Sequence, residues 1–73
     1  MSINKFKEVN KRVPPVEYND ILEDLHIESI GSQGDGIGRF ENYVIIVKDA
    51  KLGENVTCRI LSAKENFAFA EII

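Results

Sequence analysis

The feature that most constrains this chain is a run of glycines near its middle, where residues 31–38 hold four of its five glycines. Glycine at this density indicates backbone at positive φ, or backbone packed so closely against another segment that a Cβ would clash. A dinucleotide-binding loop would need the glycines of residues 34–38 to open a helix, whereas β-branched residues follow them. The run therefore predicts a small β-structure, in which the glycines let short strands bend and cross closely.

The rest of the chain divides into short apolar runs separated by turn residues. Strands are predicted over residues 21–30, 39–40, 43–47, 55–61 and 67–73, with a hairpin turn at residues 41–42 and connections at 49–53 and 63–66. This spacing predicts an all-β fold, a small five-stranded antiparallel barrel over residues 16–73, whose closure removes exposed strand edges. A short helix over residues 17–25 remains an alternative, because Asn19 or Asp20 could cap it.

Alternation within these runs predicts which side chains fill the barrel. In residues 21–30, one face carries Ile21, Leu25 and Ile27. The predicted interior comprises Leu25, Ile27, Ile30, Ile37, Val44, Ile46, Val56 and Ile60, with Cys58 as a small buried hydrophobe.

The C-terminal run alternates aromatic and small residues with a period of two. If Ala68, Ala70 and Ile72 face the interior of a narrow barrel, Phe67 and Phe69 face outward. The opposite arrangement, with both rings in the core, is the commoner one for an isolated strand. Two observations favour outward rings: the interior already has enough apolar residues, and the acidic residue at position 71 shares the face of the rings.

Size and composition exclude several classes of protein. Seventy-three residues make one domain, and a single cysteine and a single histidine exclude an intramolecular disulfide and a zinc site within one chain. No apolar run approaches the ~20 residues that span a bilayer, and no apolar segment follows the basic N-terminus as in a secretory signal. We therefore expect a cytoplasmic protein without a membrane segment, metal or cofactor.

Charge is distributed unevenly along the chain. Residues 1–13 carry four basic side chains and one acidic one, a net charge of +3, which leaves −6 for residues 14–73. The two prolines at positions 14 and 15 end this segment. Residues 1–15 are predicted to form a flexible basic arm, and a disordered terminus without a role is the alternative.

The residues offer little for catalysis. His26 has no second histidine or nucleophile that the sequence places beside it, and a solvated strand histidine is the favoured interpretation. Asp35 and Glu28 do not form a convincing acid–base pair. Binding is better supported, because outward rings beside basic side chains form a stacking platform for single-stranded nucleic acid.

In their order and spacing, several segments resemble a TRAM domain. The first half of the match comprises Asn19 and Asp20, residues 27–31 and residues 34–39; the second comprises residues 43–47, 53–54 and 67–71. The resemblance implies an OB-like five-stranded barrel that binds RNA. Such domains are appended to RNA-modifying methyltransferases and methylthiotransferases, and stand-alone versions are typical of archaea, where a role as RNA chaperones of the cold-shock type is implied. The chain differs from the family in residues 55–59, which hold one basic residue where several are usual.

The sequence thus predicts a non-enzymatic, monomeric RNA-binding module, a chaperone that binds single-stranded regions of RNA such as tRNA or mRNA. The predicted RNA-binding residues are Arg39, Phe40, Tyr43, Lys48, Arg59, Lys64, Phe67 and Phe69, with the rings stacking on bases and the cations meeting phosphates. The alternative is a protein-interaction adaptor that uses the same aromatic face.

Overall fold

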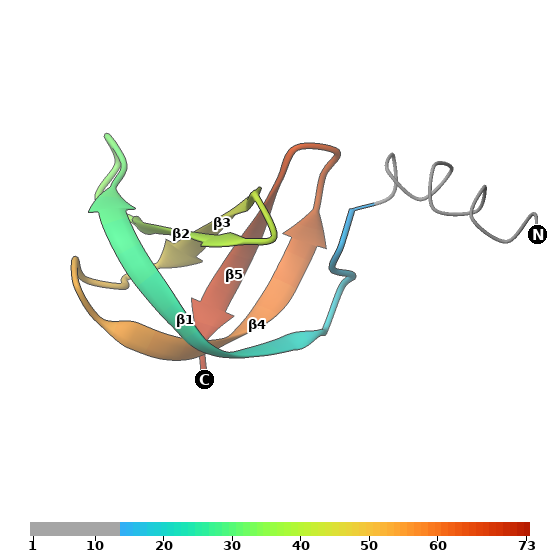
Figure 1. The fold of residues 1–73 in the computed structure, drawn as a ribbon, viewed down its shortest axis with the longest axis horizontal. Helices are drawn as coiled ribbons and strands as arrows, with labels where there is room; N and C mark the ends of the chain where they lie inside the picture. Colours follow the sequence, from blue (N-terminus) through green and yellow to red (C-terminus); the bar gives the residue numbers. More distant parts are fainter. Residues whose placement is uncertain (1–13) are drawn as a thin grey trace, which may run out of the picture.

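The computed structural model describes residues 14–73, and within them the chain forms five strands around one interior (Figure 1). The strands are β1 (Ile21–Ile30), β2 (Gly36–Phe40), β3 (Tyr43–Lys48), β4 (Asn55–Ala63) and β5 (Phe67–Ile72). They close in the order β1-β2-β3-β5-β4. The predicted all-β, OB-like barrel is confirmed, and residues 17–25 do not form the alternative helix. The predicted arm, residues 1–15, lies almost entirely outside the described residues.

One strand pair departs from the antiparallel prediction. β3 and β5 run parallel, with Val44 opposite Phe67 and Ile46 opposite Phe69, whereas the other four pairs are antiparallel. The reason is geometric. Strand directions can alternate all the way around a closed ring only when the number of strands is even, so a ring of five must contain a parallel pair. The barrel is therefore mixed.

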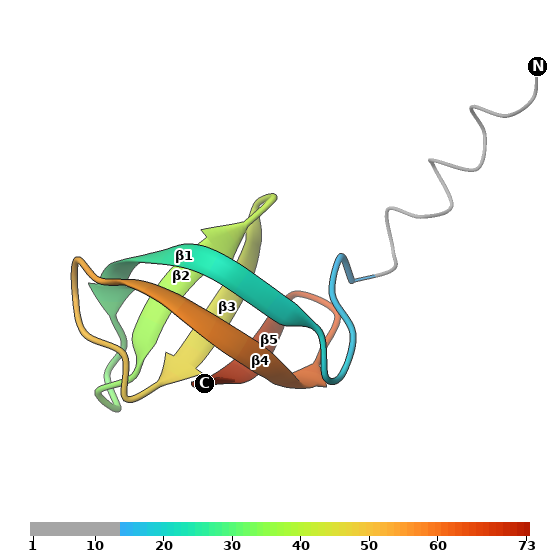
Figure 2. The same cartoon turned by 90° about the horizontal axis from the view of Figure 1, so that it is seen from below.

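The loops gather at opposite ends of the barrel. Residues 31–35, between β1 and β2, and residues 49–54, between β3 and β4, lie at one end, and residues 64–66 lie at the other (Figure 2). The turn at Glu41 and Asn42 joins β2 to β3 as predicted, with φ angles of 53° and 67°. Both residues have a left-handed backbone conformation, as a two-residue type I′ hairpin turn requires.

The core lies inside the ring and comprises Val16, Leu25, Ile27, Tyr43, Ile45, Val47, Ala50, Val56, Cys58, Ile60, Ala68 and Ala70. The prediction of burial is wrong for four residues: Ile30 is exposed, and Ile37, Val44 and Ile46 are half-exposed. In β3 the hairpin turn decides which residues face the interior. It pairs Phe40 with Tyr43, so both point to the same side of the sheet. A continuous apolar run has no alternation that could have revealed this choice.

A bulge changes the face of β1. The pairing of β1 with β4 shifts register between Leu22 and Leu25, at Asp24, whose φ is 60°. An extra residue reverses the alternation on one side of it. Leu22 therefore packs against the core with Leu25, whereas Ile21, predicted to share that face, is exposed.

The glycines of β2 let the strands approach closely, as predicted. A Cβ at Gly38 would lie 2.7 Å from the backbone oxygen of His26, and one at Gly36 would lie 2.7 Å from the Cβ of Ala50. Neither neighbour can move aside without moving backbone. Gly34, in contrast, has open space around it and a φ of +92°, so it serves the turn rather than the packing.

Within residues 14–73 there is no helix of the length and apolarity needed to cross a lipid bilayer.

Candidate functional site

An apolar patch covers the outside of the barrel over β2, β3 and β5. Strand pairing places Arg39, Val44 and Phe67 in one row and Ile37, Ile46 and Phe69 in the next. Residues that are in register on neighbouring strands point to the same side of a sheet. The residues that alternate with them along each strand point the other way and are buried. We call this surface the outer apolar face, defined by Ile37, Val44, Ile46, Phe67 and Phe69.

Phe67 and Phe69 form the aromatic part of this face. Their ring centroids lie 5.3 Å apart with the planes at 89°, an edge-to-face contact. Phe69 is 41% exposed and Phe67 is half-buried, while Ala68 and Ala70 are buried inside. The outward direction of the rings is therefore confirmed. The prediction that Ile72 also faces the interior is wrong, because this residue is 43% exposed at the end of β5.

A groove of about 500 Å³ lies beside the rings. Its apolar wall consists of Ile37, Ile46, Phe67 and Phe69, and its polar wall is the 31–35 loop with Gly31, Ser32, Gln33 and Asp35. The groove therefore combines a half-exposed aromatic pair with hydrogen-bonding groups.

Carboxylates accompany the two predicted arginines. The Nε atom of Arg39 lies 3.6 Å from the Oε2 atom of Glu28. A guanidinium nitrogen of Arg59 donates to the Oε2 atom of Glu71 at 2.5 Å, and this hydrogen bond and the negative charge raise the pKa of Arg59. Both arginines face outward with their side chains 61% and 43% exposed, but a phosphate would have to compete with a carboxylate for each.

Neither of the predicted lysines forms a salt bridge within residues 14–73. Lys48 is exposed at the end of β3, opposite Glu71 of β5. Lys64 is exposed in the loop after β4. Together with the arginines, they place positive charge at the margins of the outer apolar face and none in the groove.

Tyr43 does not belong to the surface. It is 6% exposed, and its hydroxyl shares its one proton between the carbonyl oxygens of Lys64 and Phe67, at 2.5 and 2.6 Å. Burial raises the pKa of this hydroxyl. The prediction that its ring is available for stacking is therefore wrong. Tyr43 holds the β4–β5 loop against β3 and so fixes the start of the strand that carries the rings.

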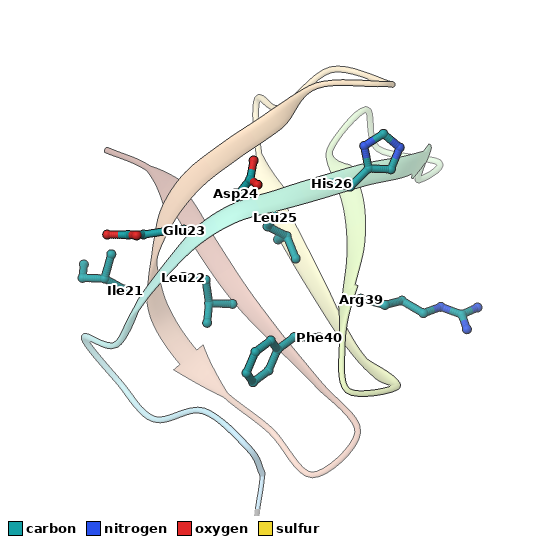
Figure 3. Close-up of a pocket in the computed structure, with 8 residues that line it drawn as sticks. All are labelled: Ile21, Leu22, Glu23, Asp24, Leu25, His26, Arg39 and Phe40. Atoms are coloured by element: carbon teal, nitrogen blue, oxygen red, sulfur yellow. The ribbon is translucent and has the colours of Figure 1, made fainter.

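Phe40 also faces inward, packing against the core at the mouth of a second hollow of about 620 Å³. This hollow lies where β1 and β2 separate, because β2 pairs with β1 only as far as Gly38. Figure 3 shows Leu22, Leu25 and Phe40 pointing toward the barrel interior, whereas Arg39 extends away from it. Phe40 is thus not part of the outer apolar face.

Polar side chains on β1 contact the start of β4. The Nδ1 atom of His26 lies 2.7 Å from the Oδ1 atom of Asn55, and the amide of Asn55 donates to Asp24 at 3.0 Å. His26 is exposed, as expected of a solvated strand histidine. Cys58 is buried, and burial raises the pKa of its thiol. In the described part of the chain, no three His, Cys, Asp or Glu side chains gather in a way that could hold a metal.

Sequence reasoning missed several surface residues. The prediction that Ile37, Val44 and Ile46 lie in the core is wrong, and the available signal was that Ile37 shares a strand face with Arg39, and Val44 and Ile46 share one with Lys48. The 31–35 loop was interpreted only through its glycines, although its polar residues line the groove. Tyr18, 71% exposed, lies beside β4 because the N–H of Asn19 donates to the carbonyl of Ile60; an aromatic residue next to a turn signal was the available clue.

Comparison with known proteins places this geometry in a family. The TRAM domain family profile matches residues 23–73. An uncharacterized protein of Methanocaldococcus jannaschii is 41% identical over 66 residues, which cover 90% of this chain and 83% of that protein. The solution structure of a conserved protein of Methanococcus maripaludis is similar with a TM-score of 0.74 and 39% identity, covering 81% of this chain and 83% of that one.

Larger proteins contain the same segment. Ribosomal RNA large subunit methyltransferase E of Haloarcula marismortui is 46% identical over 57 residues, which cover 78% of this chain but 21% of the methyltransferase. This chain spans only 14% and 21% of the length of two of the RNA methyltransferases that it matches.

Proposed function

Since this chain belongs to the TRAM domain family, we propose that it is a non-enzymatic RNA-binding module that holds single-stranded regions against its outer apolar face. The observation that carries the proposal is Phe69, a 41% exposed ring held edge-to-face by Phe67 on an outward strand face. A ring in this position can stack on an unpaired base whatever its identity. The rRNA methyltransferases among the relatives act on RNA by name, which supports the same class of ligand.

The proposed contacts divide into two kinds. Phe67 and Phe69 stack on bases, and Arg39, Lys48, Arg59 and Lys64 meet phosphates at the margins of the face. The basic residues of the predicted arm add to the second kind. Carboxylates already lie beside the two arginines, so a phosphate must displace a carboxylate there, and stacking supplies the part of the affinity that salt does not screen.

Modest affinity suits a chaperone. A protein that binds unpaired strands better than paired ones shifts the folding equilibrium of an RNA by mass action, without ATP. We therefore propose that the protein acts as an RNA chaperone on tRNA or mRNA. We further propose that it acts as a monomer and in the cytoplasm.

The test is a titration of the protein with a short unstructured RNA and with a stable hairpin at several salt concentrations. With roughly three to five phosphate contacts, the log–log salt slope should be about −2 to −3.5, from ~0.7 per phosphate. Arg39→Ala should make it shallower by about 0.7, whereas Phe69→Ala should weaken binding at every salt concentration and leave the slope nearly unchanged.

Leu52→Ala is the matched control for the aromatic substitution. Leu52 is 63% exposed in the β3–β4 loop and does not line the groove, so its loss should not change RNA binding. A protein that binds no RNA at low salt, but captures a protein partner through Phe69, would instead be the predicted adaptor.

A further inference from the structure

The groove beside Phe69 has an uneven chemistry. One wall is apolar and aromatic, the other is the 31–35 loop, and Asp35 supplies the only ionisable group among the residues that line it. Among the described residues, the Asp35 carboxylate forms no ion pair. It is half-buried, so a ligand that enters the groove meets it directly.

The loop holds the backbone of Asp35 in place. The N–H of Gly31 donates to the backbone oxygen of Asp35 at 2.9 Å, and the N–H of Gly34 donates to the carbonyl of Gly31 at 2.9 Å. These bonds close the loop on itself immediately before β2 begins at Gly36. Backbone contacts therefore fix the Cα of Asp35 beside the apolar wall, and its side chain reaches the groove from that fixed point.

The charge in the groove selects which part of a nucleotide can enter. A carboxylate repels a phosphate, and no cation lines the groove to offset that repulsion. A neutral, flat group that donates hydrogen bonds complements the groove, since its faces can contact Phe69 and Ile46 while its edge meets Asp35. A nucleobase has this chemistry, and a volume of about 500 Å³ is in the range of small-ligand sites.

Resting on the RNA-binding function proposed above, we propose that this groove binds an unpaired guanine base whose Watson–Crick edge is recognised by Asp35. An ionised carboxylate is an acceptor with two oxygens and pairs best with two donors side by side. Guanine presents N1–H and the 2-amino group next to each other on this edge. Adenine and cytosine each present one amino group beside an acceptor nitrogen, and uracil presents one N–H between two carbonyls. The side-chain amide of Gln33 can donate to O6 of guanine from the same loop.

The experiment compares short uridine oligonucleotides that carry a single central guanosine, inosine, adenosine or uridine. Binding is measured by fluorescence anisotropy, and methyl NMR of Ile37 and Ile46 locates the base. Inosine keeps N1–H and O6 but lacks the 2-amino group, so it removes one of the two donors. We expect the guanosine strand to bind about tenfold more tightly than the uridine strand, from the ~1–3 kcal/mol of a bidentate pair, with inosine between them.

The variant that tests the residue is Asp35→Asn, which keeps size and shape but loses the charge and one acceptor. It should abolish the preference for guanosine over inosine and uridine. Asp49→Asn is the control: it removes the same charge from an exposed position outside the groove, and its φ of 64° suits asparagine. It should keep the full guanosine preference.

The possible failures are distinguishable. If the uridine strand binds through Phe69 but guanosine gives no advantage, or Asp35→Asn keeps that advantage, the guanine site is wrong and the RNA-binding proposal stands. If no strand binds at low salt, both proposals fall, and a protein that shifts the Ile37 and Ile46 methyl signals would identify the groove as a protein-docking site.

Discussion

The two faces of β2 and β5 are built in opposite ways. Inside the barrel these strands present Gly36, Gly38, Ala68 and Ala70, with Phe40 at the end of β2, and outside they present isoleucine, phenylalanine and charged side chains. β1, β3 and β4 contribute large residues to the interior, including Ile27, Ile45 and Ile60, which are completely buried. A narrow ring cannot hold large side chains from all five strands. β2 and β5 therefore contribute mainly small residues to the interior, apart from Phe40, and place Ile37, Phe67 and Phe69 on the surface.

The two faces differ in how much room they leave for substitution. The inner face of β2 and β5 limits what can be inserted, because any added atom meets backbone or a packed neighbour. The outer face tolerates change structurally, and its apolar residues contribute little to the core. Substitutions on the two faces should therefore separate stability from binding.

The largest effect is expected from Gly38→Ala on the inner face. The new Cβ would lie 2.7 Å from the backbone oxygen of His26, so β1 and β2 must move apart. We expect a loss of about 2–4 kcal/mol in the free energy of unfolding, measured by urea denaturation. Gly53→Ala has open space around it and only the strain of a φ of +86°, and should cost about 1–2 kcal/mol. Equal losses would contradict the close approach of the strands.

The next effect is on binding. Phe69→Ala should weaken binding of a single-stranded RNA by about 1–3 kcal/mol, the stacking contribution of one base. Its unfolding free energy should change by less than about 1 kcal/mol, because the ring is 41% exposed. Calorimetric titration and thermal unfolding of the same sample give both values. A variant that loses stability and binding in parallel would show that the ring is part of the core.

Tyr43→Phe tests the link between the inner face and the start of β5. Without the hydroxyl, the carbonyls of Lys64 and Phe67 lose a donor, and we expect a loss of about 1–2 kcal/mol. Burial raises the pKa of Tyr43 above its ordinary value, about 10. The unfolded chain therefore loses this proton at lower pH than the folded protein, and the stabilisation is complete below that pH and falls above it. Tyr43→Phe should remove this part of the alkaline fall in stability, as followed by circular dichroism between neutral and alkaline pH.

The smallest effect is expected from Glu71→Gln on the outer face. The substitution frees Arg59 from its 2.5 Å partner, so RNA affinity should rise by about twofold to fivefold at low salt, and the salt slope should steepen by up to ~0.7. Glu41→Gln removes the same charge from the β2–β3 turn and serves as the control for net charge. If both variants bind equally well, Glu71 does not compete with phosphate for Arg59.

The sequence predicted the architecture better than the details of the site. Turn residues and apolar runs were enough for five strands, and the alternation of residues 67–71 was enough for the direction of Phe67 and Phe69. Local patterns could not reveal the parallel β3–β5 pair, which is a property of ring closure. Nor did the apolar run of β3 place Tyr43, because that run has no alternation of its own and the pairing of Phe40 with Tyr43 decides its face.

The position of β5 has a consequence for how the protein is made. β5 is the last strand in the sequence, yet it lies between β3 and β4 and pairs with both. Until it leaves the ribosome, those two strands have open edges, and an open edge is a template for pairing with another chain. Ring closure also needs contacts between residues far apart in sequence, which form slowly. The chain is thus most prone to aggregation in the interval before β5 pairs with β3 and β4, and the segment that carries the rings is also the one that seals the barrel.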